Sequence, residues 1–252
     1  MTAVLYAVPG SHPCAAVEKA LQLKGIAYRR VELIPIAHRL PTRLRFGVGS
    51  VPALTLEDGT RVSGSRTILR ALEERVPQPA LLPADKEARA LVERAEEWGD
   101  QVLQPLVRRV VWAALRRAPG AIESFAAQTK LPLPPPLARA GRPVMARMAQ
   151  RLVGASDATV RADLISLPGH LDRIDRWIAD DTLGGVSANV ADLQIGSSLR
   201  LLATVRDLGP LLDARSAGAL ARRWFPVLTG EVPAGTLPRA WVASAEERQL
   251  RQ

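Results

Sequence analysis

The sequence predicts an α/β domain over residues 1–76, a linker over residues 77–84 and an all-helical domain over residues 85–252. Three observations lead to this division. Strand-like and helix-like patterns alternate in the first 76 residues. The segment PQPALLP, from Pro77 to Pro83, suits neither a helix interior nor a sheet. After it, apolar residues recur at the three- and four-residue spacing of amphipathic helices.

The N-terminal domain begins with a predicted strand, VLYAV from Val4 to Val8, which stops at the turn signal Pro9-Gly10. A helix follows, because Pro13 suits a first helical turn and apolar residues then recur at helical spacing as far as Gly25. The order strand, helix is the start of a βαβ unit.

The rest of this domain is predicted as strand, loop, strand, strand and helix. The second strand is YRRVELI, from Tyr28 to Ile34, and a loop carrying His38 comes after it. Ala53 to Leu56 and TRVSG are the next two strands, joined by the hairpin signal EDG. SRTILRALEERV closes the domain as a helix with one apolar face.

The helical domain is predicted to begin with one long helix from Asp85 to about Arg117, kinked at Pro105. The proline-rich segment from Pro119 to Pro143 is interpreted as a connector, either a lid or a spacer. Four more helices are predicted, and at the third of them Asn189 and Asp192 fit the N-cap and N3 positions. Their ranges are 144–153, 158–178 with a break near Pro168, 189–205 and 211–224.

Composition narrows the classes of function. The chain has 252 residues and a net charge of +9, but its arginines are spread along helices beside acidic residues, so we expect no nucleic-acid partner. One cysteine and three scattered histidines exclude a disulfide framework and predict no metal site. Met1 leads directly into a strand pattern and no long apolar run occurs, so we expect a cytoplasmic protein without a membrane segment.

Five motifs in their order and spacing resemble those of the cytosolic glutathione S-transferases. They are VPGSHPCAAVEKAL, GVGSVPALTLEDG, SGSRTIL, the LP of the linker, and NVADL in the helical domain. The resemblance covers about Val4 to Asp192. It implies a thioredoxin-like N-terminal domain that binds glutathione, an all-helical C-terminal domain, and a homodimer formed through the third and fourth helices.

The resemblance also implies where glutathione binds. Pro52 would be cis and the backbone of Val51 would pair with the cysteinyl part of glutathione. Ser65, with Arg66 beside it, would hold the γ-glutamyl carboxylate at the start of a helix, where free N–H groups attract anions. Ser65 as a simple N-cap is the alternative, and the two roles are compatible.

Two further glutathione contacts follow from the same resemblance. His38 and Arg39 lie where related proteins place a cationic side chain facing the glycyl carboxylate, although simple solvation is an equal alternative. The chain departs from the family at Gly64, where an acidic or amide residue is usual. Asp100, or a residue of a second subunit, would then meet the α-ammonium group, or glutathione would bind weakly.

Ser11 and Cys14 are the candidate catalytic residues. Thiol chemistry needs the thiolate, and a hydroxyl donor at a helix start lowers a thiol pKa. Ser11 is placed to make that hydrogen bond. Cys14 is interpreted as a buried packing residue, with a mixed-disulfide site and a primary nucleophile as alternatives, and the pair SHPC cannot run a dithiol cycle within one chain. His12 is interpreted as a surface residue, with electrostatic tuning of the neighbouring site as the alternative.

The substrate pocket is predicted between the domains, lined by Trp98, Val102 and Pro105, with Trp112 as a further candidate. The favoured function is a glutathione transferase, detoxifying in type, that activates the glutathione thiol for transfer to an apolar electrophile. Glutathione is the co-substrate and no other cofactor is implied. A Cys14-dependent glutathione thiol reductase or lyase is one alternative, and a non-catalytic binding or scaffold protein is the other.

Overall fold

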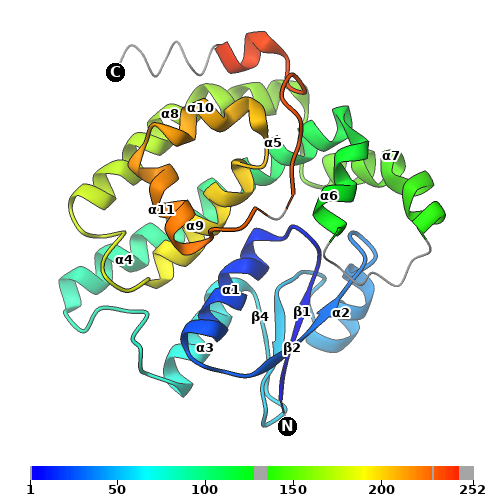
Figure 1. Cartoon of the computed structure of the whole chain (residues 1–252). Helices are drawn as coiled ribbons and strands as arrows, with labels where there is room; N and C mark the ends of the chain where they lie inside the picture. The colour runs from blue at the N-terminus through cyan, green and yellow to red at the C-terminus, as the bar shows by residue number, and fades with distance from the viewer. Residues whose placement is uncertain (1, 128–134, 229, 244–252) are drawn as a thin grey trace.

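The N-terminal domain is a four-stranded sheet with helices on it (Figure 1). The computed structural model describes residues 2–127, 135–228 and 230–243. The strands lie in the order β2-β1-β3-β4, with β1 parallel to β2 and the other two pairs antiparallel. The four strands predicted along the chain are confirmed, with ends that differ by one or two residues. The elements are β1 (Ala3–Ala7), α1 (His12–Leu23), β2 (Tyr28–Glu32), α2 (Arg39–Phe46), β3 (Ala53–Thr55), β4 (Arg61–Ser63) and α3 (Ser65–Arg75).

The core of this domain is formed by alternate residues of its strands and by the buried faces of its helices. In β1 every second residue is buried, and Leu5 lies opposite Leu54 of β3. Helices α1 and α3 pack together, and Leu21 and Leu69 are fully buried. Helix α1 also packs on α9 of the second domain, so it lies between the sheet and the helices (Figure 1). The start of α1 is therefore held at the junction of the domains.

Helix α2 occupies the segment predicted as a loop, so that prediction is wrong. Leu40 and Leu44 are 67% and 80% exposed, and only Thr42 of this helix is buried. The apolar residues that would mark a helical stripe therefore face outward, and Pro41 reads as a breaker although it lies in the first turn, where proline is tolerated.

The described part of the second domain is helical apart from its turns and one isolated bridge between Val205 and Val232. None of its helices, nor any other in the described ranges, combines the length and apolar character needed to cross a membrane. The elements are α4 (Lys86–Trp98), a π-helical turn η1 (Gly99–Leu103), α5 (Gln104–Arg117), η2 (Pro119–Ala121), α6 (Ile122–Ala126), α7 (Pro135–Leu152), α8 (Asp157–Ala179), α9 (Val190–Leu202), η3 (Arg206–Leu208), α10 (Gly209–Asp213) and α11 (Ser216–Trp224).

The predicted long helix is divided by the π-helical turn η1. Pro105 lies in the first turn of α5 and has no N–H to donate, so the irregularity falls just before it rather than as a kink at it. The N–H of Gln104 bonds the carbonyl of Gly99, five residues back. A Cβ at Gly99 would lie 2.9 Å from Ile195 Cγ1, so this glycine allows η1 to pack closely on α9.

Proline misled the prediction at two other places. The connector proposed for Pro119 to Pro143 is wrong where the structure describes it, because α6 and α7 occupy most of that range; residues 128–134 lie outside the described residues. Helix α8 continues through Pro168, where a break was predicted. In contrast, the helix predicted over residues 211–224 is two helices, α10 and α11.

The predicted linker lies between α3 and α4, and Lys24 fixes it to the first domain. The Lys24 side chain is fully buried, and its ammonium donates to Glu73 Oε2 at 2.5 Å, to the Val76 carbonyl at 2.6 Å and to the Pro79 carbonyl at 2.7 Å. All three of its N–H donors are used. The Glu73 carboxylate also accepts from the N–H of Leu81, so a buried ion pair holds the chain where it leaves the first domain.

Candidate functional site

A cavity of about 560 Å³ lies between the two domains, a volume suited to a small organic ligand. One wall comes from the turn between β1 and α1, the segment after β2, the residues before β3 and the start of α3. The other wall comes from η1, α5, α6 and α7. Residues far apart in the sequence therefore line one cavity.

Ser11 lines this cavity at the start of α1. Its backbone is extended, and its Oγ accepts a hydrogen bond of 3.4 Å from the N–H of Cys14, so Ser11 is the N-cap. Because the oxygen is the acceptor in that bond, the bond does not use the hydroxyl proton. The start of α1 also carries the positive end of the helix dipole. The hydroxyl and the helix start can together stabilise an anionic atom in the cavity.

Cys14 is fully buried and is not among the residues that line the cavity. Burial raises the pKa of its thiol to about 11, and this outweighs the opposing effects of Ser11 and the Val8 backbone. The thiol is therefore protonated at neutral pH. Of the two predicted catalytic residues, the structure places only Ser11 in the cavity wall.

Val51 and Pro52 line the cavity next to β3, and the peptide bond between them is cis. The Pro52 carbonyl accepts from the N–H of Gly64 at 3.0 Å. Within the described part of the chain no hydrogen bond is formed by the backbone of Val51. An extended ligand can therefore pair with this backbone as an added strand.

Ser65 is the first residue of α3, and the N-cap is Gly64. Gly64 has φ of 86°, a conformation that favours glycine, so the residue that departs from the family pattern suits the backbone here. Ser65 is 6% exposed, and its Oγ accepts from Gln194 Nε2 at 3.2 Å. Ser65 and the free N–H groups of α3 meet in the cavity wall, as anion binding requires.

Asp100 is brought to this wall by a chain of hydrogen bonds. Gln194 Nε2 donates to Asp100 Oδ1 at 2.9 Å as well as to Ser65. Gln104 Nε2 donates to the same oxygen at 3.3 Å, and Arg108 Nη2 donates to Gln104 Oε1 at 2.6 Å. The amide of Gln194 thus joins the Asp100 carboxylate to Ser65. Asp100 can therefore supply the acidic group that Gly64, which has no side chain, does not.

His38 and Arg39 line the cavity at the start of α2. Burial, with the charge of Arg39 beside it, lowers the pKa of His38, so its imidazole is neutral at pH 7. Arg39 is exposed at the cavity rim and carries the positive charge of this pair.

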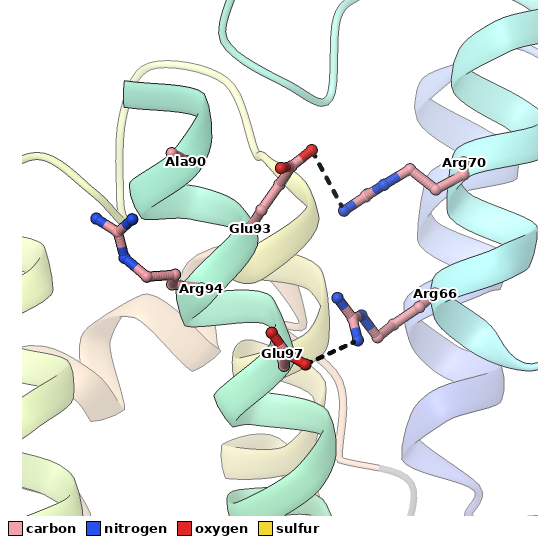
Figure 2. A pocket seen from close by; sticks show the side chains of 6 residues that line it. All are labelled: Arg66, Arg70, Ala90, Glu93, Arg94 and Glu97. Carbon is pink, nitrogen blue, oxygen red and sulfur yellow. Dashed lines mark ion pairs between the residues drawn. The ribbon is translucent and has the colours of Figure 1, made fainter. Parts of the chain in front are cut away.

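Arg66 points away from the cavity. It faces α4, with its Nε 3.5 Å from Glu96 and its Nη1 3.9 Å from Glu97. Figure 2 shows Arg66 and Arg70 reaching from α3 across a surface hollow toward the carboxylates of α4. The position next to Ser65 therefore contributes to helix pairing, since successive residues of a helix point in different directions.

The predicted pocket residues Trp98, Val102 and Pro105 do not line the cavity. Trp98 instead packs on His170 and Trp177 of α8, with ring centroids 5.5 and 5.2 Å apart. The lining face of this segment is offset from that of Trp98 because the π-helical turn changes the rotation per residue. It consists of Asp100, Gln104, Arg108, Val111, Trp112 and Leu115, which includes the further candidate Trp112.

His12 was interpreted as a surface residue, and this interpretation is wrong. It is 4% exposed, it lines the cavity, and neither ring nitrogen has a hydrogen-bond partner among the described residues. Arg108 and Gln194 were also missed. No sequence signal marks them, because their roles depend on how α5 and α9 pack against α1 and α3.

Comparison with known proteins gives one family match. Residues 5–80 match the model of the glutathione S-transferase N-terminal domain. A curated maleylacetoacetate isomerase of Pseudomonas aeruginosa is 40% identical over 91 residues, which are 34% of this chain. The match spans 43% of that relative's length, so less than half of it is represented.

Solved structures resemble the chain over nearly its full length. A glutathione S-transferase of Rhodospirillum rubrum has a TM-score of 0.59 at 22% identity, covering 96% of this chain and 99% of its own. A glutathione S-transferase of Methylobacterium radiotolerans, in complex with glutathione sulfonate, has a TM-score of 0.56 at 22% identity, covering 94% and 99%. At this identity the likeness shows a shared fold.

Proposed function

We propose that the chain is an enzyme of the cytosolic glutathione S-transferase superfamily, which binds glutathione between its domains and transfers it to an electrophilic compound. The match of residues 5–80 to the N-terminal domain of that family and the shared fold support this. The observation that carries the proposal is the position of Ser11. Its hydroxyl lies at the start of α1 in the cavity wall, in the same cavity as Val51, Ser65 and Arg39. These residues supply one matching group for each part of the tripeptide.

Glutathione has two carboxylates, an ammonium group, a peptide backbone and a thiol. We assign its γ-glutamyl carboxylate to Ser65 and the start of α3, and its ammonium group to Asp100. The cysteinyl backbone pairs with Val51. The glycyl carboxylate lies toward His38 and Arg39. The thiol then faces Ser11.

Ser11 acts by donating its hydroxyl proton in a hydrogen bond to the sulfur, which favours the thiolate over the thiol. The sulfur attacks the electrophilic carbon, a sulfur–carbon bond forms, and the leaving group departs with its electron pair. Val111, Trp112 and Leu115 provide an apolar wall for the electrophile. Thiolate stabilisation and proximity supply the rate enhancement.

An isomerase reaction is a second candidate, favoured by the match to a maleylacetoacetate isomerase. In such a reaction the same thiolate adds to a conjugated double bond and leaves again after rotation, so glutathione is not consumed. Measuring glutathione consumption with a cis-alkenoyl substrate separates the two candidates.

Two alternative functions receive less support from the structure. A reductase or lyase that depends on Cys14 needs an accessible thiolate, whereas Cys14 is buried and protonated at neutral pH. A non-catalytic binding protein fits the cavity but gives no reason for Ser11 and Ser65 to share it.

Titration calorimetry with glutathione, followed by an assay with chlorodinitrobenzene, tests the proposal. We expect binding with one site per chain and glutathione-dependent product formation. Absence of glutathione binding by folded protein would reject the enzyme in favour of the binding module. A mixed disulfide at Cys14 in native protein would favour the reductase.

We also propose a homodimer through α3 and α4. The surface hollow between them carries both signs of charge, with Arg66, Arg70 and Arg94 beside Glu93 and Glu97. Such a surface can pair with its own copy across a twofold axis. Light scattering at several salt concentrations measures the mass and its dependence on charge.

A further inference from the structure

The helical wall of the cavity holds the guanidinium group of Arg108, which the proposed glutathione site leaves without a role. Arg108 donates to the neutral amide of Gln104 and forms no ion pair with a carboxylate in the described ranges. Asp100 acts on it only through space, and burial with the charge of Arg109 outweighs that effect, which lowers the pKa of Arg108. Of the other arginines in the cavity wall, Arg142 is paired with Glu123 at 2.9 Å and Arg39 faces the glycyl end.

His12 lines the same cavity, and the positive charge of Arg108 acts on it. It is 96% buried in the wall next to Ser11, and neither of its ring nitrogens has a hydrogen-bond partner in the described part of the chain. Burial and the charge of Arg108 hold the pKa of His12 well below 6.5, so at neutral pH one nitrogen is a donor and the other an acceptor.

Burying a guanidinium whose partner is a neutral amide, next to an unpartnered imidazole, is costly. The cation loses water without gaining a carboxylate, and the imidazole loses water without gaining a hydrogen bond. An aliphatic side chain would fill either position more favourably in a purely apolar pocket. Both groups line the same cavity, so a bound anion would satisfy both. A carboxylate suits a guanidinium, since its two oxygens match the paired N–H donors.

We propose that Arg108 and His12 bind a carboxylate of the second substrate, so that the preferred electrophiles are anions with an apolar body. This inference rests on the proposed function, because it assigns the other cavity groups to glutathione. Arg108 lies one turn before Val111 and Trp112 on α5. A carboxylate at Arg108 therefore places the apolar part of the molecule along Trp112 and Leu115, with the reacting carbon toward Ser11.

The test uses two electrophiles of the same shape, p-chloromethylbenzoate and p-chloromethylbenzamide. With either one, the glutathione sulfur bonds to the benzylic carbon, the carbon–chlorine bond breaks, and chloride leaves with its electron pair while buffer takes the thiol proton. Only the charge of the para group differs. We expect kcat/KM to be at least about tenfold higher for the benzoate, the effect of one charge-assisted hydrogen bond.

Binding is measured separately with the two products, S-(p-carboxybenzyl)glutathione and S-(p-carbamoylbenzyl)glutathione, by calorimetry. The carboxylate product should bind at least about tenfold more tightly. Arg108→Gln should abolish this preference and Arg108→Lys should retain part of it. Arg161→Gln is the matched control, because it removes the same charge from an exposed position of α8, outside the cavity.

Each result decides the inference. Equal affinity of wild-type protein for the two products would overturn it while leaving the proposed function in place. A loss in Arg108→Gln that is the same for both products would also overturn it, because it would assign Arg108 to the sulfur. Failure of glutathione and both products to bind would overturn the inference and the proposed function together. The wild-type comparison needs no variant, so it holds even if Arg108→Gln is unstable.

Discussion

Ser11 has two separable tasks, since its oxygen caps α1 and its hydroxyl proton is proposed to reach the glutathione sulfur. Ser11→Ala removes both. We expect kcat/KM with chlorodinitrobenzene to fall about a hundredfold, the usual effect of losing one donor to a developing anion. The ultraviolet absorbance of bound thiolate, followed against pH, should show a higher pKa for the bound thiol.

Ser156→Ala is the control for the capping task. Ser156 caps α8, accepting from the N–H of Thr159 at 3.1 Å, and is not part of the cavity wall. Both variants should lose about 1 kcal/mol of unfolding free energy. Only Ser11→Ala should lose activity, and equal losses of activity in the two would assign Ser11 to capping alone.

The buried thiol of Cys14 leads to a prediction of how the free energy of unfolding changes with pH. Its folded pKa is about 11, raised by burial from an ordinary value of 9.0. Above pH 9 the unfolded chain loses the thiol proton while the folded chain keeps it, so unfolding becomes easier as pH rises toward 11. Relative to Cys14→Ala, wild-type protein should lose up to about 3 kcal/mol over this interval and nothing below it. Urea unfolding of both proteins at several pH values measures the difference, and a constant difference up to pH 11 would show that the thiol is not buried in solution.

At the scale of elements, the capping box of α9 anchors the centre of the helical domain. Asp192 is fully buried and accepts from the N–H groups of Gly184 at 2.8 Å and Asn189 at 2.9 Å. Asp192→Ala leaves both donors buried without a partner, and we expect a loss of about 3 kcal/mol in urea unfolding. Asp157→Ala is the control, an exposed aspartate in the first turn of α8 whose loss should cost under about 1 kcal/mol. Similar losses in the two variants would contradict the buried role.

Helices were predictable where capping residues or apolar spacing in the sequence coincide with residues that are buried in the fold. Asn189 and Asp192 mark the start of α9 by spacing alone, and the structure confirms the capping box. Helix α2 was missed because its leucines are exposed, so no buried stripe appears in its sequence. The part of α7 before Val144 was missed because a run of prolines resembles a connector, although proline is tolerated in a first turn. The rest of α7 was predicted as a helix over residues 144–153, and the structure confirms it.

At the scale of the whole molecule, the N-terminal part of the cavity wall was predictable, whereas in the helical part only Asp100 and Trp112 were named from the sequence. Ser11, Val51 and Ser65 each follow or precede a strand, so the sheet brings them together. The offset of Trp98 from the cavity depends on the π-helical turn, and the approach of Gln194 to Ser65 depends on packing between domains. Neither is encoded by local spacing.

The side chain of Gln194 connects the two domains at the cavity. Replacing it tests whether this connection is needed for glutathione binding. It donates to Ser65 in the first domain and to Asp100 in the second, and it is 1% exposed. Gln194→Met keeps the length of the side chain but removes both hydrogen bonds. Asp100 is then no longer held beside Ser65, so glutathione should bind about tenfold more weakly by calorimetry.

The kinetic signature separates this positioning role from general damage. KM for glutathione should rise in Gln194→Met while kcat changes little, because Ser11 and the start of α1 are unaltered. Gln101→Met is the matched control. Gln101 is exposed and, among the described residues, its side chain bonds only Glu97, at 3.0 Å, so its loss should leave KM unchanged. A folded Gln194→Met protein with wild-type affinity for glutathione would show that Asp100 reaches the ammonium group unaided or does not bind it.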